Sequence, residues 1–520
     1  MKRLFLTAAF FLLAFETFAS SYRISKVEYD IDGMTKVYAL EQNIPVDKKR
    51  IFSTKEELDS YVEDLKQSYL NQRNFESAEI EYEIYTLLDF SEDSVTEANV
   101  ENEITEITLR VALKDSRHLL VLPYPKYSSS SGFTLKLKAK DTNFLGTLSE
   151  FNADTFFAFV NEDDSDKMNF QFGFNIDYDF PFKIGTVDAK WINEYDFSYM
   201  INDSCPEFSA QTGLEFDFPV KDFSINLQFL QMAGNDLDYL SYGDALYFGN
   251  KVNLSVPLNL YQSKSYTDFY LIPYLDFTAY YDTDGISKEN LSLSSPLLQM
   301  GTEFKADNIN WHGNFRDGYY FDLKPSYGYN LQLQTSVPRF SFDIEAFKSF
   351  KRLALSGRIY GFIQSEKNSY EKVGSYIRGV RDESHFAKGS AFEDSIALNV
   401  QSAIIFNFDL PIRLFTWDWT KFSKSSFLEN LNFEVQINPF IDIALTTNLE
   451  TARYFYPGDG YYAGGFEVLV FPQKWRGIVV RGSMGFDLGN LLLSKMEFYD
   501  TSWRRDVSAY EIYIGIGLHY

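Results

Sequence analysis

Apolar and polar residues alternate along most of the chain after about residue 128, in runs long enough for extended strands. One side of each run is apolar and often aromatic, and the other carries charged or amide side chains. A period of two predicts β-strands with one face in an apolar environment and the other in a polar one. The clearest runs have apolar positions at Phe133 to Ala139, Phe151 to Phe159, Met168 to Tyr178, Phe223 to Phe229 and Phe340 to Ala346.

The length and charge of these runs favour a barrel that crosses a membrane. A strand that crosses a bilayer needs about 9 to 11 residues and must pair its backbone with both neighbours. Charged residues such as Lys136 and Asp154 would then face a polar lumen. Residues 128–520, at roughly 24 residues per strand and loop, predict a transmembrane β-barrel of about 16 antiparallel strands. A soluble β-sandwich would alternate too and is the alternative fold.

The last run, residues 510–520, is apolar or aromatic on one face as far as the final tyrosine. Two glycines interrupt its other face, and glycine weakens a strand because it offers no packing and costs backbone entropy. A barrel closes between its first and last strands, and we expect the first at residues 132–139. The sequence therefore predicts a weak seam. The residues expected there are Phe133, Leu135, Leu137, Gly515, Gly517 and Tyr520.

Residues 22–117 have a different pattern, with helical spacing between short alternating runs. Ser53 to Glu56 form a predicted capping box, in which Ser53 accepts from the first turn and Glu56 reaches back. The residues that follow predict one apolar helix face: Leu58, Val62, Leu65 and Tyr69. Alternation predicts strands at Val27 to Ile31, Ile80 to Ile84 and Ile104 to Leu113. The result is a small α+β domain.

Residues 1–19 have the composition of a secretory signal peptide, with Lys2 and Arg3 before an apolar stretch and Ala19 in a small-residue cleavage site. No later run approaches the ~18 to 20 apolar residues of a membrane helix. Aromatic residues nevertheless make up 18% of the chain. Girdles of aromatic side chains at the two interfaces of a membrane barrel would account for this excess.

The net charge of −25 disfavours nucleic acid as a partner, because phosphates would be repelled. Cys205 is the only cysteine, so no intrachain disulfide can form, and we expect a thiol without a role.

The sequence offers little that could carry a reaction. His118, His312, His385 and His519 are scattered without metal-ligand spacing. The motifs of serine hydrolases, zinc proteases and phosphate-binding loops are missing. The acidic turn at residues 162–166 lacks the glycine and distal glutamate of a calcium loop. We therefore expect no enzyme, no cofactor and no metal.

One stretch invites a more specific interpretation: Ile377-Arg378-Gly379-Val380. Glycine beside arginine is typical of a tight bend that projects the arginine, because glycine accepts backbone angles that other residues resist. A loop arginine folded into a barrel interior would need an anionic partner, since an unpaired buried charge is costly. Asp442, on a later alternating run, is the candidate.

These residues resemble motifs of the outer-membrane protein assembly factor superfamily (BamA/TamA-like). Its barrels carry a loop motif of isoleucine or valine, arginine, glycine and an aromatic residue, and a later strand motif Phe-x-Asp. The turn at residues 143–146, Asn-Phe-Leu-Gly, and the stretch at residues 313–319 also resemble that family. Residues 22–117 resemble one polypeptide-transport-associated (POTRA) domain. The resemblance implies that the loop folds into the lumen and that Arg378 meets Asp442 there.

The resemblance also implies a function. The expected protein lies in the bacterial outer membrane, with a periplasmic POTRA-like domain at 22–117 and the barrel at 128–520. It would capture unfolded outer-membrane proteins at an exposed sheet edge and insert them through the weak seam. Its partners would be the lipid bilayer, these clients, and periplasmic chaperones or accessory assembly proteins. The alternatives are a secretion pore of the two-partner type, or a passive porin or adhesin.

Overall fold

The computed structural model describes residues 21–520 except for gaps at 86–103, 129–131, 162–167, 202–203, 222, 263–267, 366–370, 374–375, 381–398, 423–427, 429, 449–450 and 505–509. The predicted signal peptide, the acidic turn at 162–166 and His385 therefore lie outside the described residues. The chain divides into two compact units. One comprises the residues up to Leu70 together with Phe75–Asp115, and the other comprises Asn71–Asn74 and Ser116–Tyr520.

The first unit is a four-stranded sheet with two helices. The sheet order is β2 (Ile51–Phe52), β1 (Ser21–Asp32), β4 (Ile104–Asp115) and β3 (Phe75–Tyr85), with β1 parallel to β4 and the other neighbours antiparallel. Helix α3 (Lys55–Asn71) buries the apolar face that its spacing predicts. A further helix, α2 (Val37–Asn43), occupies a stretch with no predicted element. Strand β3 is an edge strand, so one side of its backbone has no partner strand among the described residues.

The cap of α3 differs from the prediction by one residue. The backbone N–H of Glu57 donates to Thr54 Oγ1 at 3.2 Å, and Glu57 Oε2 accepts from the backbone N–H of Ser53 at 3.0 Å. The side chain that caps the helix is therefore Thr54 rather than Ser53, and the glutamate that reaches back is Glu57 rather than Glu56, with the N–H of Ser53 as its donor. A threonine serves as well as a serine in this role, so the sequence alone did not separate the two registers.

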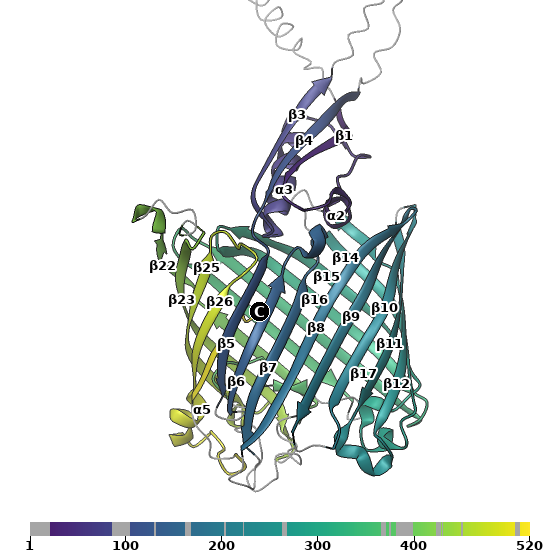
Figure 1. The fold of residues 1–520 in the computed structure, drawn as a ribbon, viewed down its shortest axis with the longest axis vertical. Coiled ribbons are helices and arrows are strands. Elements are labelled where there is room, and N and C mark those ends of the chain that lie inside the picture. Colours follow the sequence, from purple (N-terminus) through teal and green to yellow (C-terminus); the bar gives the residue numbers. More distant parts are fainter. Residues whose placement is uncertain are drawn as a thin grey trace, which may run out of the picture. The chain divides into compact units, whose positions relative to one another are not determined.

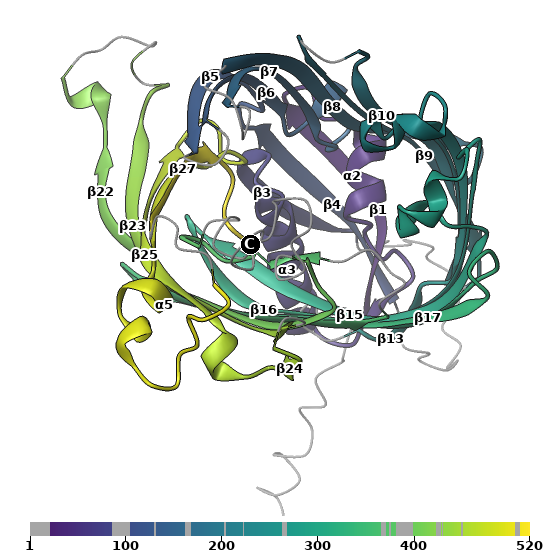
Figure 2. The same ribbon diagram turned by 90° about the horizontal axis from the view of Figure 1, so that it is seen from below.

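The second unit is one large antiparallel sheet that curls into a barrel (Figures 1 and 2). Its earlier strands are β5 (Leu119–Ser128), β6 (Gly132–Asp141), β7 (Phe151–Asn161), β8 (Met168–Ile184), β9 (Val187–Met200), β10 (Glu207–Val220), β11 (Phe223–Asn235), β12 (Leu246–Ser255), β13 (Leu258–Gln262), β14 (Asp268–Tyr281), β15 (Leu297–His312), β16 (Phe315–Asn330), β17 (Thr335–Ser349) and β18 (Ala354–Gln364). Its later strands are β21 (Ser402–Asp409), β22 (Ile412–Trp417), β23 (Phe433–Asn448), β24 (Arg453–Tyr454), β25 (Tyr461–Pro472), β26 (Val480–Asp487) and β27 (Tyr510–Ile516). Between them, β19 (Glu371–Lys372) and β20 (Asn399–Val400) form a separate two-stranded sheet, and α5 (Leu488–Leu491) follows β26.

The barrel has more strands than the expected 16. The described residues give 21 strand segments, and three of these continue a neighbour: β12 and β13 both pair with β14, β21 and β22 both pair with β23, and β24 extends the pairing of β25 along β23. This leaves 18 strand positions. The estimate was low because some strands are joined by turns of two residues, as at 185–186 and 313–314, which shortens the average repeat.

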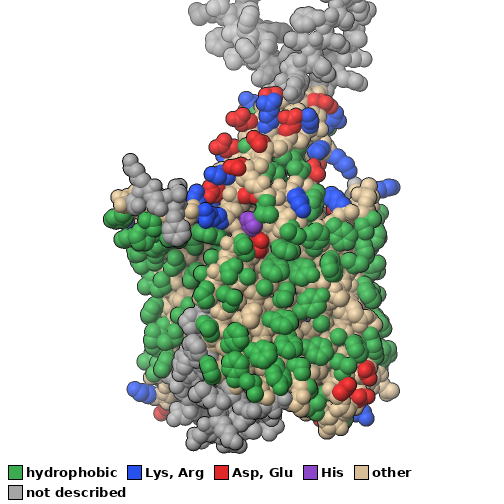
Figure 3. All heavy atoms as spheres, viewed as in Figure 1, with side chains coloured by type: hydrophobic (Ala, Val, Ile, Leu, Met, Phe, Trp, Pro, Cys, Tyr) green, Lys and Arg blue, Asp and Glu red, His purple; other side chains and the backbone are tan. Residues whose placement is uncertain are grey.

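The two faces of the sheet divide as the alternation predicts. Leu135, Phe157 and Phe229 are nearly half exposed on the outer surface, and apolar side chains form a broad belt across the face of the barrel seen in Figure 3. Lys138 and Asp154 lie on the opposite face of β6 and β7, with Nζ 3.9 Å from Oδ2. None of the helices in the described part of the chain is long and apolar enough to cross a membrane.

The first strand of the barrel is β5, not residues 132–139. Strand β6, which carries Phe133, Leu135 and Leu137, is paired along its length with β5 on one side and β7 on the other. These three residues therefore do not lie at the seam. The sequence did not predict β5 because Pro123 and Pro125 interrupt its alternation, and proline argues against a central strand.

The last strand is also shorter than its alternation suggests. Strand β27 ends at Ile516, and Gly517 has a positive φ of 103°. This left-handed conformation is accessible to glycine at no steric cost. Of the predicted seam residues, Gly515 lies in β27, whereas Gly517 and Tyr520 lie beyond its end.

Candidate functional site in the barrel interior

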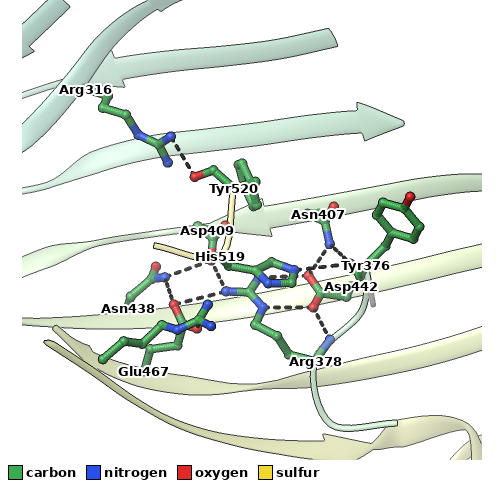
Figure 4. A network of polar contacts seen from close by, with 11 residues as sticks. Arg316, Tyr376, Arg378, Asn407, Asp409, Asn438, Asp442, Glu467, His519 and Tyr520 are labelled. Atoms are coloured by element: carbon green, nitrogen blue, oxygen red, sulfur yellow. Dashed lines mark hydrogen bonds and ion pairs between the residues drawn. The ribbon is translucent and has the colours of Figure 1, made fainter. Parts of the chain in front are cut away.

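The long connection between β18 and β21 packs against the inner wall of the barrel at Tyr376–Val380. Ile377 and Val380 are buried in one apolar cluster with Phe362 of β18, Ile405 of β21 and Ala444 of β23. This burial of two aliphatic side chains holds the short turn between them against three strands. Arg378, which lies between them with Gly379, consequently points along the wall toward Asp442 and Glu467 (Figure 4).

Arg378 binds Asp442 of β23 through three hydrogen bonds. Its Nε and Nη2 donate to Oδ2 and Oδ1 at 2.9 and 2.8 Å, and its backbone N–H donates to Oδ2 at 2.8 Å. The exposed fraction is 6% for Arg378 and 0% for Asp442. A planar guanidinium held by both carboxylate oxygens is a specific, charge-assisted arrangement that a lysine could not reproduce.

Two further carboxylates meet the same guanidinium. Nη1 of Arg378 lies 2.8 Å from Asp409 Oδ1 of β21 and 3.1 Å from Glu467 Oε2 of β25. The guanidinium also lies over the ring of Phe440, with 3.8 Å between its central carbon and the ring centroid. One loop arginine therefore joins three neighbouring strands, β21, β23 and β25. We name Arg378, Asp409, Asp442 and Glu467 the arginine cluster.

Two asparagines complete the hydrogen bonding of these carboxylates. Asn407 donates to Asp442 Oδ1 at 2.9 Å and to the Tyr376 carbonyl oxygen at 2.8 Å. Asn438 donates to Asp409 Oδ1 and Glu467 Oε2, both at 2.8 Å. Buried charges are tolerated only when such partners replace the lost water.

The electrostatics of the cluster favour a permanently charged arginine. Burial alone opposes the charge, but the hydrogen bond with Asp442 and the charges of Asp409, Asp442 and Glu467 outweigh it and raise the pKa of Arg378 above its ordinary value. Because three carboxylates face one guanidinium, removing that guanidinium would leave a buried concentration of negative charge.

Gly379 brings the loop into contact with the strands next to the seam. Its φ is 85°, and a Cβ placed there would lie 2.6 Å from the backbone carbon of Gly485 on β26. The backbone N–H of Gly379 donates to Glu511 Oε2 of β27 at 3.0 Å. The close approach of the two glycines thus allows the loop to hold the last strand directly.

The residues after β27 turn into the same interior region. His519 Nε2 lies 3.2 Å from the Tyr376 carbonyl oxygen, and Arg316 Nη1 of β16 donates to the Tyr520 carbonyl oxygen at 2.8 Å. Leu518 packs against a small buried cluster that includes Leu469 and Phe471 of β25. Residues 518–520 therefore connect the seam strand to the loop and to the opposite part of the wall (Figure 4).

Sequence reasoning singled out Arg378 and Asp442, which the structure places together, but it missed Asp409, Glu467 and the two asparagines. A signal for them exists in the printed sequence. In β21 the polar residues Asn407 and Asp409 stand at every second position between phenylalanines, so they face inward when the phenylalanines face outward. Among the described residues, no three His, Cys, Asp or Glu side chains are placed to hold a metal ion.

No protein-family model and no curated protein matches the sequence. Among solved structures the chain is similar to BamA from Haemophilus ducreyi lacking POTRA domains 1–3, with 12% identity, 94% of this chain and 83% of that chain covered, and a TM-score of 0.37. It is also similar to CdiB from Acinetobacter baumannii, with 11% identity, coverage of 96% and 74%, and a TM-score of 0.46. For CdiB from Escherichia coli the identity is 8%, the coverage 96% and 91%, and the TM-score 0.37.

Proposed function

We propose that this chain is a β-barrel of the bacterial outer membrane that inserts other barrel proteins through the seam between β27 and β5. The observation that supports this most directly is the pairing at the seam. The strand order closes the barrel with β27 and β5 as hydrogen-bonded neighbours, whereas residue-by-residue registers define the pairing of β26 with β27 and of β5 with β6. No such register joins β27 to β5 in the described residues.

The composition of β5 gives a physical reason for this weakness. Pro123 and Pro125 have no backbone N–H, and because they are two residues apart in a strand, both missing donors face the same neighbour. Proline is tolerated in a strand where its N–H would have pointed to an unpaired edge. We therefore assign the missing donors to the side of β5 that faces β27, where they would leave fewer hydrogen bonds between the two strands that close the barrel.

The arginine cluster would brace the barrel while the seam opens. It ties the loop to β21, β23 and β25, and Gly379 ties the same loop to Glu511 of β27. An incoming client strand could then exchange hydrogen bonds one for one with the seam strands. This needs no nucleotide, because pairing with the client replaces the pairing that is lost.

The apolar belt supports a membrane location, and the short turns of the barrel would face the periplasm as in other outer-membrane barrels. The first unit would then be a periplasmic POTRA-like domain. Its edge strand β3, which has no partner strand on one side among the described residues, offers that side to an extended client. Unfolded barrel proteins, and the chaperones or accessory proteins that deliver them, are the proposed partners, and we propose no chemical reaction.

A secretion pore would use the same fold but pass its substrate through the lumen. Tyr376–Val380 and residues 518–520 occupy part of that interior and would have to leave it. A passive porin or adhesin would need neither the seam nor the free edge of β3. We therefore prefer insertion through the seam.

Depletion of the protein from its native bacterium separates these functions. Insertion predicts that many different outer-membrane barrels decline together, because each needs the seam. The measurement is quantitative proteomics of isolated outer membranes, with re-expression of the wild-type chain as the control. Loss of a single exported protein would contradict insertion in favour of secretion, and loss of small-solute uptake alone would favour a porin.

A further inference from the structure

A hairpin at one rim of the barrel bends away from the wall (Figures 1 and 2). It consists of β22, the adjoining end of β23 and the short 3-10 helix Trp419–Lys421. Strand β18 pairs with β21, and next to β22 only a single bridge, Leu353 with Ile412, is formed in the described residues. Beyond that point the described part of β22 pairs with β23 alone.

The projecting hairpin carries a cluster of exposed aromatic rings. The exposed fraction is 47% for Phe415, 38% for Trp417 and 71% for Phe422. The ring of Trp417 stacks on Phe422 with centroids 5.6 Å apart and contacts Trp419 at the same distance. Large aromatic side chains gathered at a surface in this way indicate a binding face, because a soluble surface rarely leaves such a cluster in water.

This face continues the apolar outer surface of the barrel. Phe415 and Trp417 stand opposite Val435 and Phe433 in the register with β23. The other face of the hairpin is polar, with Arg413 Nε 2.8 Å from Glu434 Oε2. The aromatic face therefore lies on the same side of the sheet as the exposed Ile441 and Phe408 in the outer belt.

We propose that the aromatic face of this hairpin, made of Phe415, Trp417, Trp419 and Phe422, is an anchor in the boundary between the headgroups and acyl chains of a phospholipid bilayer. Tryptophan prefers this boundary because its ring is apolar and its indole N–H is polar. Lys421 ends the 3-10 helix beside the rings and supplies a charge for lipid phosphate. The proposal rests on the membrane location in the proposed function but not on insertion of clients.

The anchor would hold a particular part of the wall. Strand β21 continues into β22, and β23 forms the second strand of the hairpin. These strands carry Asp409 and Asp442 of the arginine cluster. A hairpin fixed in the bilayer boundary would thus keep the braced side of the barrel in place at a constant depth.

The test is the position of a fluorescent label in the bilayer. The full chain with Cys205→Ser carries Phe422→Cys, labelled with nitrobenzoxadiazole and reconstituted into vesicles of phosphatidylcholine and phosphatidylglycerol. Phe415→Cys provides a second position on the same face. Phe229→Cys marks the outer belt, and Glu79→Cys on β3 marks a surface in water.

We expect spin-labelled lipid to quench the label at positions 422 and 415 several times more strongly than at position 79. We also expect aqueous iodide to show the opposite order. If iodide quenches positions 422 and 415 as strongly as position 79 while position 229 stays protected, the anchor is refuted and the face is left as a protein contact. Because position 229 reports the membrane location separately, failure of the anchor and failure of the proposed location are distinguishable.

Discussion

Replacing Arg378 by alanine is expected to abolish insertion of client barrels. The substitution leaves Asp409, Asp442 and Glu467 buried around a lost cation, and removal of one partner from a buried ion pair costs about 3–5 kcal/mol. If the loop loses that much binding free energy, the ratio of bound to detached loop falls by about 100-fold or more. The measurement is the insertion rate of an unfolded client into vesicles that contain the variant.

A second readout shows whether the loop has moved. In a Cys205→Ser background, Tyr376→Cys should react with a thiol reagent faster when Arg378 is alanine than when it is arginine. Arg352→Ala is the matched control, because Arg352 is an exposed residue in the turn between β17 and β18. With lysine at position 378, the thiol should react at a rate between those measured with arginine and with alanine. Lysine keeps the charge but cannot contact both carboxylate oxygens of Asp442 as arginine does. Wild-type insertion by Arg378→Ala would remove the arginine cluster from the mechanism.

Substitutions at the contact between the loop and β26 are expected to impair client insertion nearly as strongly. A Cβ at Gly485 would lie 2.5 Å from the Cα of Gly379, and a Cβ at Gly379 would meet the backbone of Gly485 at a similar distance. Such overpacking costs about 1–3 kcal/mol, and alanine at the positive φ of Gly379 adds about 1–2 kcal/mol. We expect Gly485→Ala and Gly379→Ala to lower the unfolding temperature of the barrel and to slow client insertion.

Gly482, three residues earlier on the same strand, supplies the control. A Cβ at Gly482 meets no atom within 4 Å, so Gly482→Ala should behave as the wild type in both measurements. Equal behaviour of Gly485→Ala and Gly482→Ala would show that the loop does not press against β26 in the membrane.

The sequence predicts the parts of this fold that depend on periodicity. Alternation identified the outer face of β6, β7 and β11, and helical spacing identified the buried face of α3, because both patterns record which side of an element leaves water. The partnership of Arg378 with Asp442 was accessible for a different reason. A charged residue beside glycine in a predicted barrel loop requires a buried counter-charge, and the resemblance to a known loop motif pointed to one.

Other features depend on contacts between distant segments, which periodicity does not record. Asp409 and Glu467 belong to the cluster only because β21, β23 and β25 are neighbours. The beginning of the barrel was misplaced because the prolines of β5 look like a linker when the strand beside them is unknown. The inward turn after β27 follows from the backbone of Gly517, whereas the alternation of residues 510–520 alone indicates a straight strand.

Site-directed photo-crosslinking tests the seam most directly. A photoreactive amino acid is placed at Ile514 on β27 or Val121 on β5, and at Phe229 or Met300 as controls on fully paired strands; all four side chains are about half exposed on the outer surface. During insertion of a client barrel, we predict client adducts from Ile514 and Val121 and none above background from the two controls. Efficient insertion with equal adducts at all four positions, or with none at the seam, would contradict the proposal that clients enter the membrane between β27 and β5.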